Sequence, residues 1–126
     1  MHDQPNVEEL VQAVKNFVDD TAMSELSGRS AFLARVTSNV LGTILRDLEA
    51  RERNDTEEKV RLSDLLGAAP ESSLNSMNEE LRNRIRSGAL SISSPGLLDH
   101  LKKTAIAQLK VDQPNYSALN TALEEP

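Results

Sequence analysis

The sequence predicts an all-α fold, a single-domain irregular helical bundle of about five helices around a long central helix at residues 29–52. Three observations carry this prediction. Apolar residues recur at helical spacing in five segments, turn and capping residues separate these segments, and no stretch alternates long enough to form a paired strand. Aromatic residues make up 2% of the chain, so its core must consist mainly of Leu, Val, Ile and Ala.

Composition narrows the class of protein. The 126 residues suit one domain, and the absence of cysteine excludes disulfides, thiolate metal sites and a cysteine nucleophile. A net charge of −6 opposes binding to nucleic acid or to an anionic membrane. No apolar run approaches the roughly 20 residues of a membrane span, and the N-terminus carries no apolar signal segment. We therefore expect a soluble, cytoplasmic protein.

The first helix is predicted to follow Asn6, which can cap it together with Glu9. Its apolar face contains Val7, Leu10, Val11, Val14, Phe17 and Val18. We expect this helix to end near Asp20, before a polar connection with a short helical turn around Met23.

The central helix is predicted from about Arg29 to Arg53, where Asn54 and Asp55 should break it. Its apolar positions follow the helical period and should be mostly buried: Leu33, Val36, Val40, Ile44 and Leu48. Five residues from other helices should pack against them: Leu10, Val14, Leu81, Leu101 and Leu109.

Three shorter helices are predicted next. One runs from Asp55 to Leu66, before Gly67, and one begins near Leu74 and stops at Gly88. The last begins at Ser94-Pro95, buries Leu97, Leu98, Leu101, Ala105, Ile106 and Leu109, and is closed by Pro114. We expect one helical domain at residues 1–117 and a weakly ordered tail at 118–126.

No pattern of residues predicts catalysis, a cofactor or a metal. The chain lacks Glu-x-x-His, Gly-x-Ser-x-Gly and glycine-rich nucleotide-binding motifs. His2 lies at the terminus, and His100 is expected on the surface or flank of its helix.

One polar group lies beside the apolar face of the central helix. Arg35, Asn39, Gly42 and Arg46 form a stripe, and Asp47 projects into the apolar arc. In one interpretation these residues make structural ion pairs, and Gly42 allows close helix contact. In the other, the two arginines bind an anionic ligand or the carboxylates of a partner.

Asp47 needs a cation or several donors if it is buried and ionised. Arg29, Arg86 and Lys103 are the candidates, and Arg86, at the end of the fourth helix, is our choice. We hypothesise a structural ion pair between Asp47 and Arg86.

The chain resembles a bacterial helical domain family of unknown function over residues 3–117. The resemblance is carried by QPNVEELVQAVKNFV, GRSAFLARVTSNVLGTILRDLE, LRNRIRSGAL and LLDHLKKTAIAQLKVDQPNYS. Genes of this family lie beside aminoglycoside-phosphotransferase-like kinases and acyl-CoA dehydrogenases, which implies an accessory role near acyl-CoA metabolism.

The family's recurring polar residues fall on Gly28, Arg29, Arg35, Asn39, Arg46, Asp47, Arg86, Gly88, Asp112, Pro114 and Tyr116. The chain departs from the family at Asp47, where glutamate is usual, and at Gln108, where a basic residue is usual. The resemblance implies no activity.

The leading functional expectation is a non-catalytic accessory or protein-interaction domain, whose partner is a kinase-like or acyl-CoA-handling enzyme. The alternative is a small-molecule binding protein that holds an anionic group on the arginine stripe. An enzyme that uses Asp47 as an acid or base is a third possibility without a second catalytic group. The candidate binding residues are Arg29, Arg35, Asn39, Arg46, Asp47, Arg86 and Tyr116. An exposed apolar patch would favour the interaction, and an enclosed pocket lined by Arg35 and Arg46 would favour the ligand.

Overall fold

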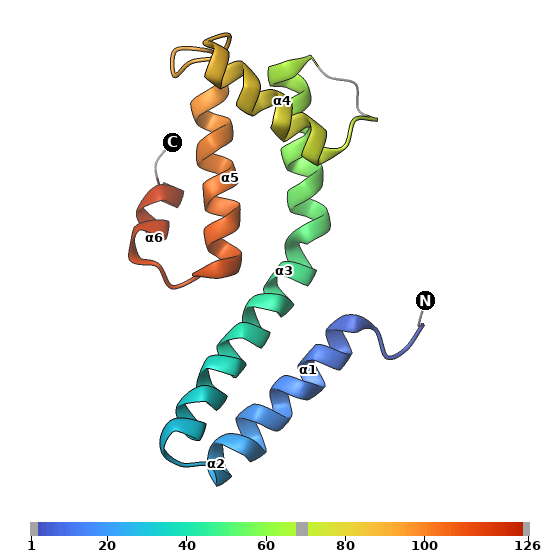
Figure 1. Ribbon diagram of the computed structural model, residues 1–126, viewed down its shortest axis with the longest axis vertical. Coiled ribbons are helices and arrows are strands. Elements are labelled where there is room, and N and C mark those ends of the chain that lie inside the picture. The colour runs from blue at the N-terminus through green and yellow to red at the C-terminus, as the bar shows by residue number, and fades with distance from the viewer. Residues whose placement is uncertain (1–2, 68–70, 125–126) are drawn as a thin grey trace. The chain divides into compact units, whose positions relative to one another are not determined.

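The structure is a computed structural model that describes residues 3–67 and 71–124. The described residues form helices and turns and contain no strand (Figure 1). The prediction of an all-α fold around a long central helix is therefore confirmed. The chain divides into two compact units, one ending at Ala50 and the other beginning at Arg51.

The first unit is a helical hairpin. Helix α1 (Val7–Phe17) begins with the predicted capping box, in which Asn6 and Glu9 bond to each other's backbone N–H groups. The chain continues into η1 (Val18–Ala22), a π-helical turn, and α2 (Met23–Glu25), so it stays helical beyond the end predicted near Asp20. The first half of α3 (Gly28–Leu66) then runs antiparallel to α1 (Figure 1).

Helix α3 continues without interruption for 39 residues. The predicted break at Asn54 and Asp55 is wrong, and the segment expected as a separate helix is the second half of α3. Asparagine and aspartate each cost a helix roughly 0.7 kcal/mol relative to alanine. Relative to other good helix formers the cost is only a few tenths of a kcal/mol. Burial of Leu62 and Leu66 just beyond them outweighs that penalty.

The second unit packs α4 (Leu74–Ser87), α5 (Leu97–Asp112) and α6 (Ser117–Glu124) with the end of α3. Its core consists of Leu62, Leu66, Met77, Leu81 and Leu97, with Leu65, Leu74 and Leu90 packed against them. Helix α6, in the stretch expected to be a weakly ordered tail, folds back along α5 and buries Leu119.

The ends of α4 and α5 illustrate how turn residues act. Gly88 ends α4 at φ +81°, as the sequence predicts. Helix α5 begins two residues later than expected, because Ser94 accepts a hydrogen bond from the Ser91 backbone in the preceding turn. Gly96, in the left-handed conformation, therefore takes the capping position predicted for Ser94.

The predicted burial of the central helix is largely wrong. Leu33, Val36, Val40 and Ile44 are exposed, and Leu48 is half-buried. Of the residues expected to pack against them, Leu10, Val14 and Leu101 are exposed, Leu109 is half-buried, and Leu81 is buried in the second unit. On α5, Leu97 is buried but Leu98 and Ala105 are exposed. His2 and residues 68–70, in the predicted connection between the helices that end at Leu66 and begin near Leu74, lie outside the described residues.

Candidate functional site

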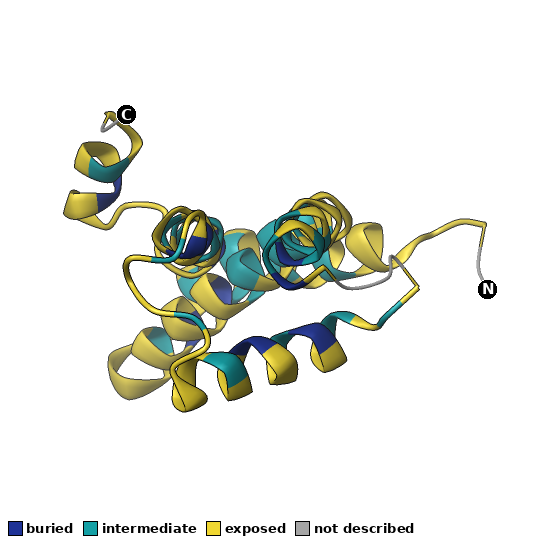
Figure 2. Cartoon of the chain, turned by 90° about the horizontal axis from the view of Figure 1, so that it is seen from above, coloured by how far each residue is buried: buried dark blue, intermediate teal, exposed yellow. Residues whose placement is uncertain are grey.

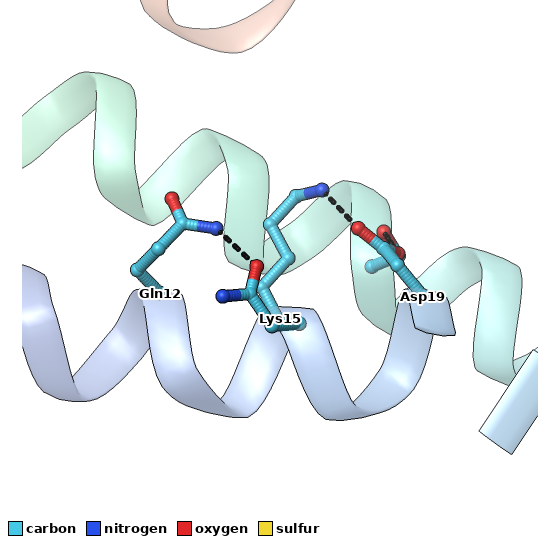
Figure 3. Close-up of polar contacts among 5 residues, drawn as sticks. Gln12, Lys15 and Asp19 are labelled. Atoms are coloured by element: carbon cyan, nitrogen blue, oxygen red, sulfur yellow. Dashed lines mark hydrogen bonds and ion pairs between the residues drawn. The ribbon is translucent and has the colours of Figure 1, made fainter. Parts of the chain in front are cut away.

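The inner seam of the first unit is polar. Asp19 accepts hydrogen bonds from Lys15, at 2.6 Å in its own helical run, and from Ser38 on the facing helix α3 (Figure 3). Gln12 and Asn16 form a second bond along α1, from Nε2 to Oδ1 at 2.8 Å. Of these bonds, the one between Ser38 and Asp19 connects the two helices, whereas the other two lie within the first helical run.

The seam also holds the carboxylate of Asp19 in its charged form. The hydrogen bond from Lys15, and then that from Ser38, lower the pKa of Asp19, against a smaller opposing effect of burial. Small residues allow the approach: Ala34 is buried, and a Cβ added to Gly42 would lie 3.6 Å from Cε of Lys15. The seam thus combines small residues and one charged pair with apolar side chains that are buried or half-buried on the same helix faces: Val11, Val18, Leu41 and Leu45.

Eight of the large apolar side chains of this unit are exposed along two helix faces. We call them the apolar stripes: Val7, Leu10, Val14 and Phe17 on α1, and Leu33, Val36, Val40 and Ile44 on α3. Their exposed fractions range from 39% for Ile44 to 61% for Phe17, and Figure 2 shows how little of the chain is buried. Among the described residues of the unit, the buried apolar side chains are Val18 and Ala34.

The two stripes lie toward the same side of the hairpin. Successive residues of a helix are turned by about 100°. On this basis the α1 stripe is turned by about 90° from the residues of α1 that face α3, and the α3 stripe is turned by about 150° from the residues of α3 that face α1. Both rotations have the same sense about their own helix axis. Because the helices are antiparallel, equal senses of rotation lead to one common side. No charged residue falls within the α3 stripe between Leu33 and Ile44.

The predicted arginine stripe lies on the flank of this unit. Arg35 and Asn39 are exposed. Arg46 is half-buried, donates a hydrogen bond to Thr43 at 3.2 Å within α3, and its guanidinium lies 3.3 Å from where a Cβ on Gly42 would stand. Asp47 is also half-buried, so it lacks the full burial that its place in the apolar pattern predicted.

The other predicted site residues are dispersed. Arg29 is exposed in the first turn of α3, on the same helix face as Asp47. Arg86 is exposed in the last turn of α4, and Tyr116, 48% exposed, precedes α6. The ion pair between Asp47 and Arg86 stays a prediction.

Sequence reasoning missed a polar cluster in the second unit. His100 is 2% exposed, which makes its predicted surface position wrong. Its Nδ1 accepts a hydrogen bond from Nε of Arg61 at 3.3 Å, and the same guanidinium donates to Thr104. The signal was available, since Leu97, His100, Thr104 and Val111 share one face of a helix at spacings of three, four and seven.

Burial, followed by the charge of Arg61, lowers the pKa of His100, against opposing effects of Glu58 and Asp99. The histidine lines a pocket of about 150 Å³ with Arg61, Asp64, Leu65, Pro95, Gly96 and Asp99. A second pocket, of about 310 Å³, lies beside α4 and is lined by Leu66, Ser72, Ser76, Met77, Glu79, Glu80 and Asn83. Neither pocket contains a residue proposed from the sequence, and the His100 cluster supplies an internal hydrogen-bond network for α3 and α5.

Within residues 3–67 and 71–124, no three His, Asp or Glu side chains are grouped as metal ligands. In the same part of the chain, no helix combines the length and the apolar character that crossing a bilayer requires.

Comparison with curated proteins and with solved structures finds no match. A family model described as "Domain of unknown function (DUF6285)" matches residues 24–116. This range covers most of the chain, including α3, α4 and α5, and begins after α1. The chain therefore belongs to the DUF6285 family of unknown function.

Proposed function

We propose that this chain is a non-catalytic protein-interaction domain with an accessory role. The observation that carries the proposal is the pair of apolar stripes on the first unit. Together their eight residues expose roughly 700 Å² along two helix faces, and the largest single patch on a typical monomer is about 300–600 Å². Apolar exposure of this extent favours contact with another polypeptide.

The arrangement of the stripes supports the same conclusion. A helical hairpin that contained its own core would turn its large apolar residues inward, whereas this one leaves eight of them exposed and has a polar contact, from Ser38 to Asp19, between its helices. Since apolar burial is the main stabilising term in folding, a covering surface would add much to the stability of this unit.

The resemblance supplies the proposed setting, which is the bacterial cytoplasm and an accessory role beside a kinase-like or acyl-CoA-metabolising enzyme. The alternative, an anionic group held by Arg35 and Arg46, draws on exposed Arg35 and Asn39 beside the stripes.

A binding titration tests the proposal. Because the chain has no cysteine, a single one introduced at exposed Asn115 can carry a fluorescent dye. The labelled chain is titrated with unlabelled chain, with a purified kinase-like enzyme and with an acyl-CoA dehydrogenase-like enzyme. Val14→Asp places a charge within the α1 stripe, and Asn16→Asp places the same charge on the opposite half of α1 as a matched control.

We expect at least one of the three proteins to bind the wild type and Asn16→Asp, and to bind Val14→Asp more than tenfold more weakly, because an unpaired charge is costly to bury. Equal affinities of the two variants, or no binding, would contradict the proposal. A rise in melting temperature with phosphate that Arg35→Ala removes would support the anionic ligand instead.

A further inference from the structure

The α3 stripe is bounded by opposite charges. Arg29 lies one turn before Leu33, and Asp47 lies one turn after Ile44 at the other end. The two residues are 18 positions apart, which is five whole helical turns, so both project from the same face of α3 as the stripe. The uncharged apolar face of the helix thus has a cation at its N-terminal end and an anion at its C-terminal end.

This pattern is complementary to itself when two such helices run antiparallel. With both helices aligned at position 38, Arg29 of each copy meets Asp47 of the other at both ends of the contact. In the same alignment Val36 of one copy lies opposite Val40 of the other. A parallel pairing would instead place like charges together.

We propose that the surface formed by the apolar stripes is covered by a second copy of this chain, with α3 packed antiparallel to α3. The inference rests on the proposed function and names the polypeptide that the stripes contact. The eight residues of the stripes expose roughly 700 Å² per copy, which is the most that they can bury and lies just below the about 800 Å² that each partner contributes to a standard interface.

Charge also disfavours other occupants. No charged residue of α1 lies on the helix face that carries the α1 stripe, which consists of Val7, Leu10, Val14 and Phe17. A membrane-binding amphipathic hairpin would need a basic border, whereas this chain carries a net charge of −6. An apolar surface whose nearest flanking charges are Arg29 at one end and Asp47 at the other suits a twofold contact with itself.

The first test is the molar mass of the whole chain, measured by light scattering and sedimentation at several concentrations. We expect a dimer for the wild type and a monomer for Val14→Asp, with the circular dichroism of both showing the same helical content. Asn16→Asp should remain dimeric.

The second test exchanges the end charges. Arg29→Glu and Asp47→Lys each bring like charges together at both ends, so each variant alone should dimerise at least tenfold more weakly than the wild type. A mixture of the two variants restores opposite charges at both ends, and we expect it to form a mixed dimer with one copy of each. Glu49→Lys, the same inversion on the opposite side of α3, should dimerise as the wild type does.

The outcomes separate this inference from the proposed function. A monomeric wild type, even at high concentration, overturns the second copy as occupant; if an enzyme then binds in a manner that Val14→Asp abolishes, the proposed function stands. A monomeric wild type that binds no enzyme overturns both. A dimer whose charge variants fail to pair when mixed overturns the antiparallel contact.

Discussion

Two adjacent leucines of α5 provide a direct test of the second unit's core. Leu97 is 2% exposed and packs with Leu62, Leu66, Met77 and Leu81, whereas Leu98 is 57% exposed. Substitution of either leucine by alanine removes the same carbon atoms from the same turn of the same helix. The difference in stability between the two variants therefore measures the effect of burial, because both substitutions change the helix propensity by the same amount.

The expected difference follows from this burial. Leucine to alanine removes three carbons, or about 2.4 kcal/mol of transfer free energy at roughly 0.8 kcal/mol per CH₂ when the side chain is fully buried. The cavity left at Leu97 raises the loss to about 3–4 kcal/mol, within the range measured for buried leucines. At Leu98, where more than half of the residue is already in water, we expect about 1 kcal/mol or less.

Urea unfolding followed by circular dichroism is the suitable assay, because the chain has no tryptophan and a single tyrosine. All three proteins are compared at one chain concentration, so that self-association contributes equally. Equal losses in the free energy of unfolding for Leu97→Ala and Leu98→Ala would refute this account of the core.

Three further predictions concern single polar or glycine positions. In His100→Asn, stability should fall less steeply than in the wild type as the pH drops below 6.5. The lowered pKa of His100 means that the unfolded chain takes up its proton first, a loss of at most about 1.4 kcal/mol per pH unit in the wild type; urea unfolding at several pH values measures it, and an unchanged slope would contradict the assignment. Gly88→Ala should reduce the free energy of unfolding by about 1 kcal/mol, because φ is +81° there although the space is open, and Gly88→Asn should reduce it less; equal losses would argue against backbone strain. Ser73→Ala should lower the melting temperature, with a loss of about 1 kcal/mol, because it removes the hydrogen bond to the backbone of Ser76 that caps α4; an unchanged melting temperature would show that this cap is dispensable.

Local features of the fold were predictable because short-range chemistry determines them. The capping box of Asn6 and Glu9 and the glycine at the end of α4 depend on residues within one helical turn. The break predicted at Asn54 and Asp55 failed because burial of Leu62, several residues away, outweighs a small propensity penalty.

The face that each helix buries was harder to predict. Periodicity identifies an apolar face but does not say whether this chain or another molecule covers it. In α3, Leu33 and Leu62 belong to equally good helical patterns, yet the first is exposed and the second is fully buried. His100 was assigned to the surface or flank of its helix because it lies between the predicted apolar positions, whereas its spacing from Leu97 places it on the buried face.

In the first unit, the polar residues that align the two helices differ from the apolar residues that form the exposed surface. The hydrogen bond from Ser38 to Asp19 forms only when the two helices stand at one axial offset, so it favours the pairing of turns that the hairpin adopts, while Lys15 holds the Asp19 carboxylate from its own helical run. The stripes contribute surface without setting that offset. Exchange of leucine, isoleucine and valine within the stripes can therefore alter how strongly the hairpin adheres to its surroundings while its internal alignment stays the same. Substitution of Ser38 would do the reverse.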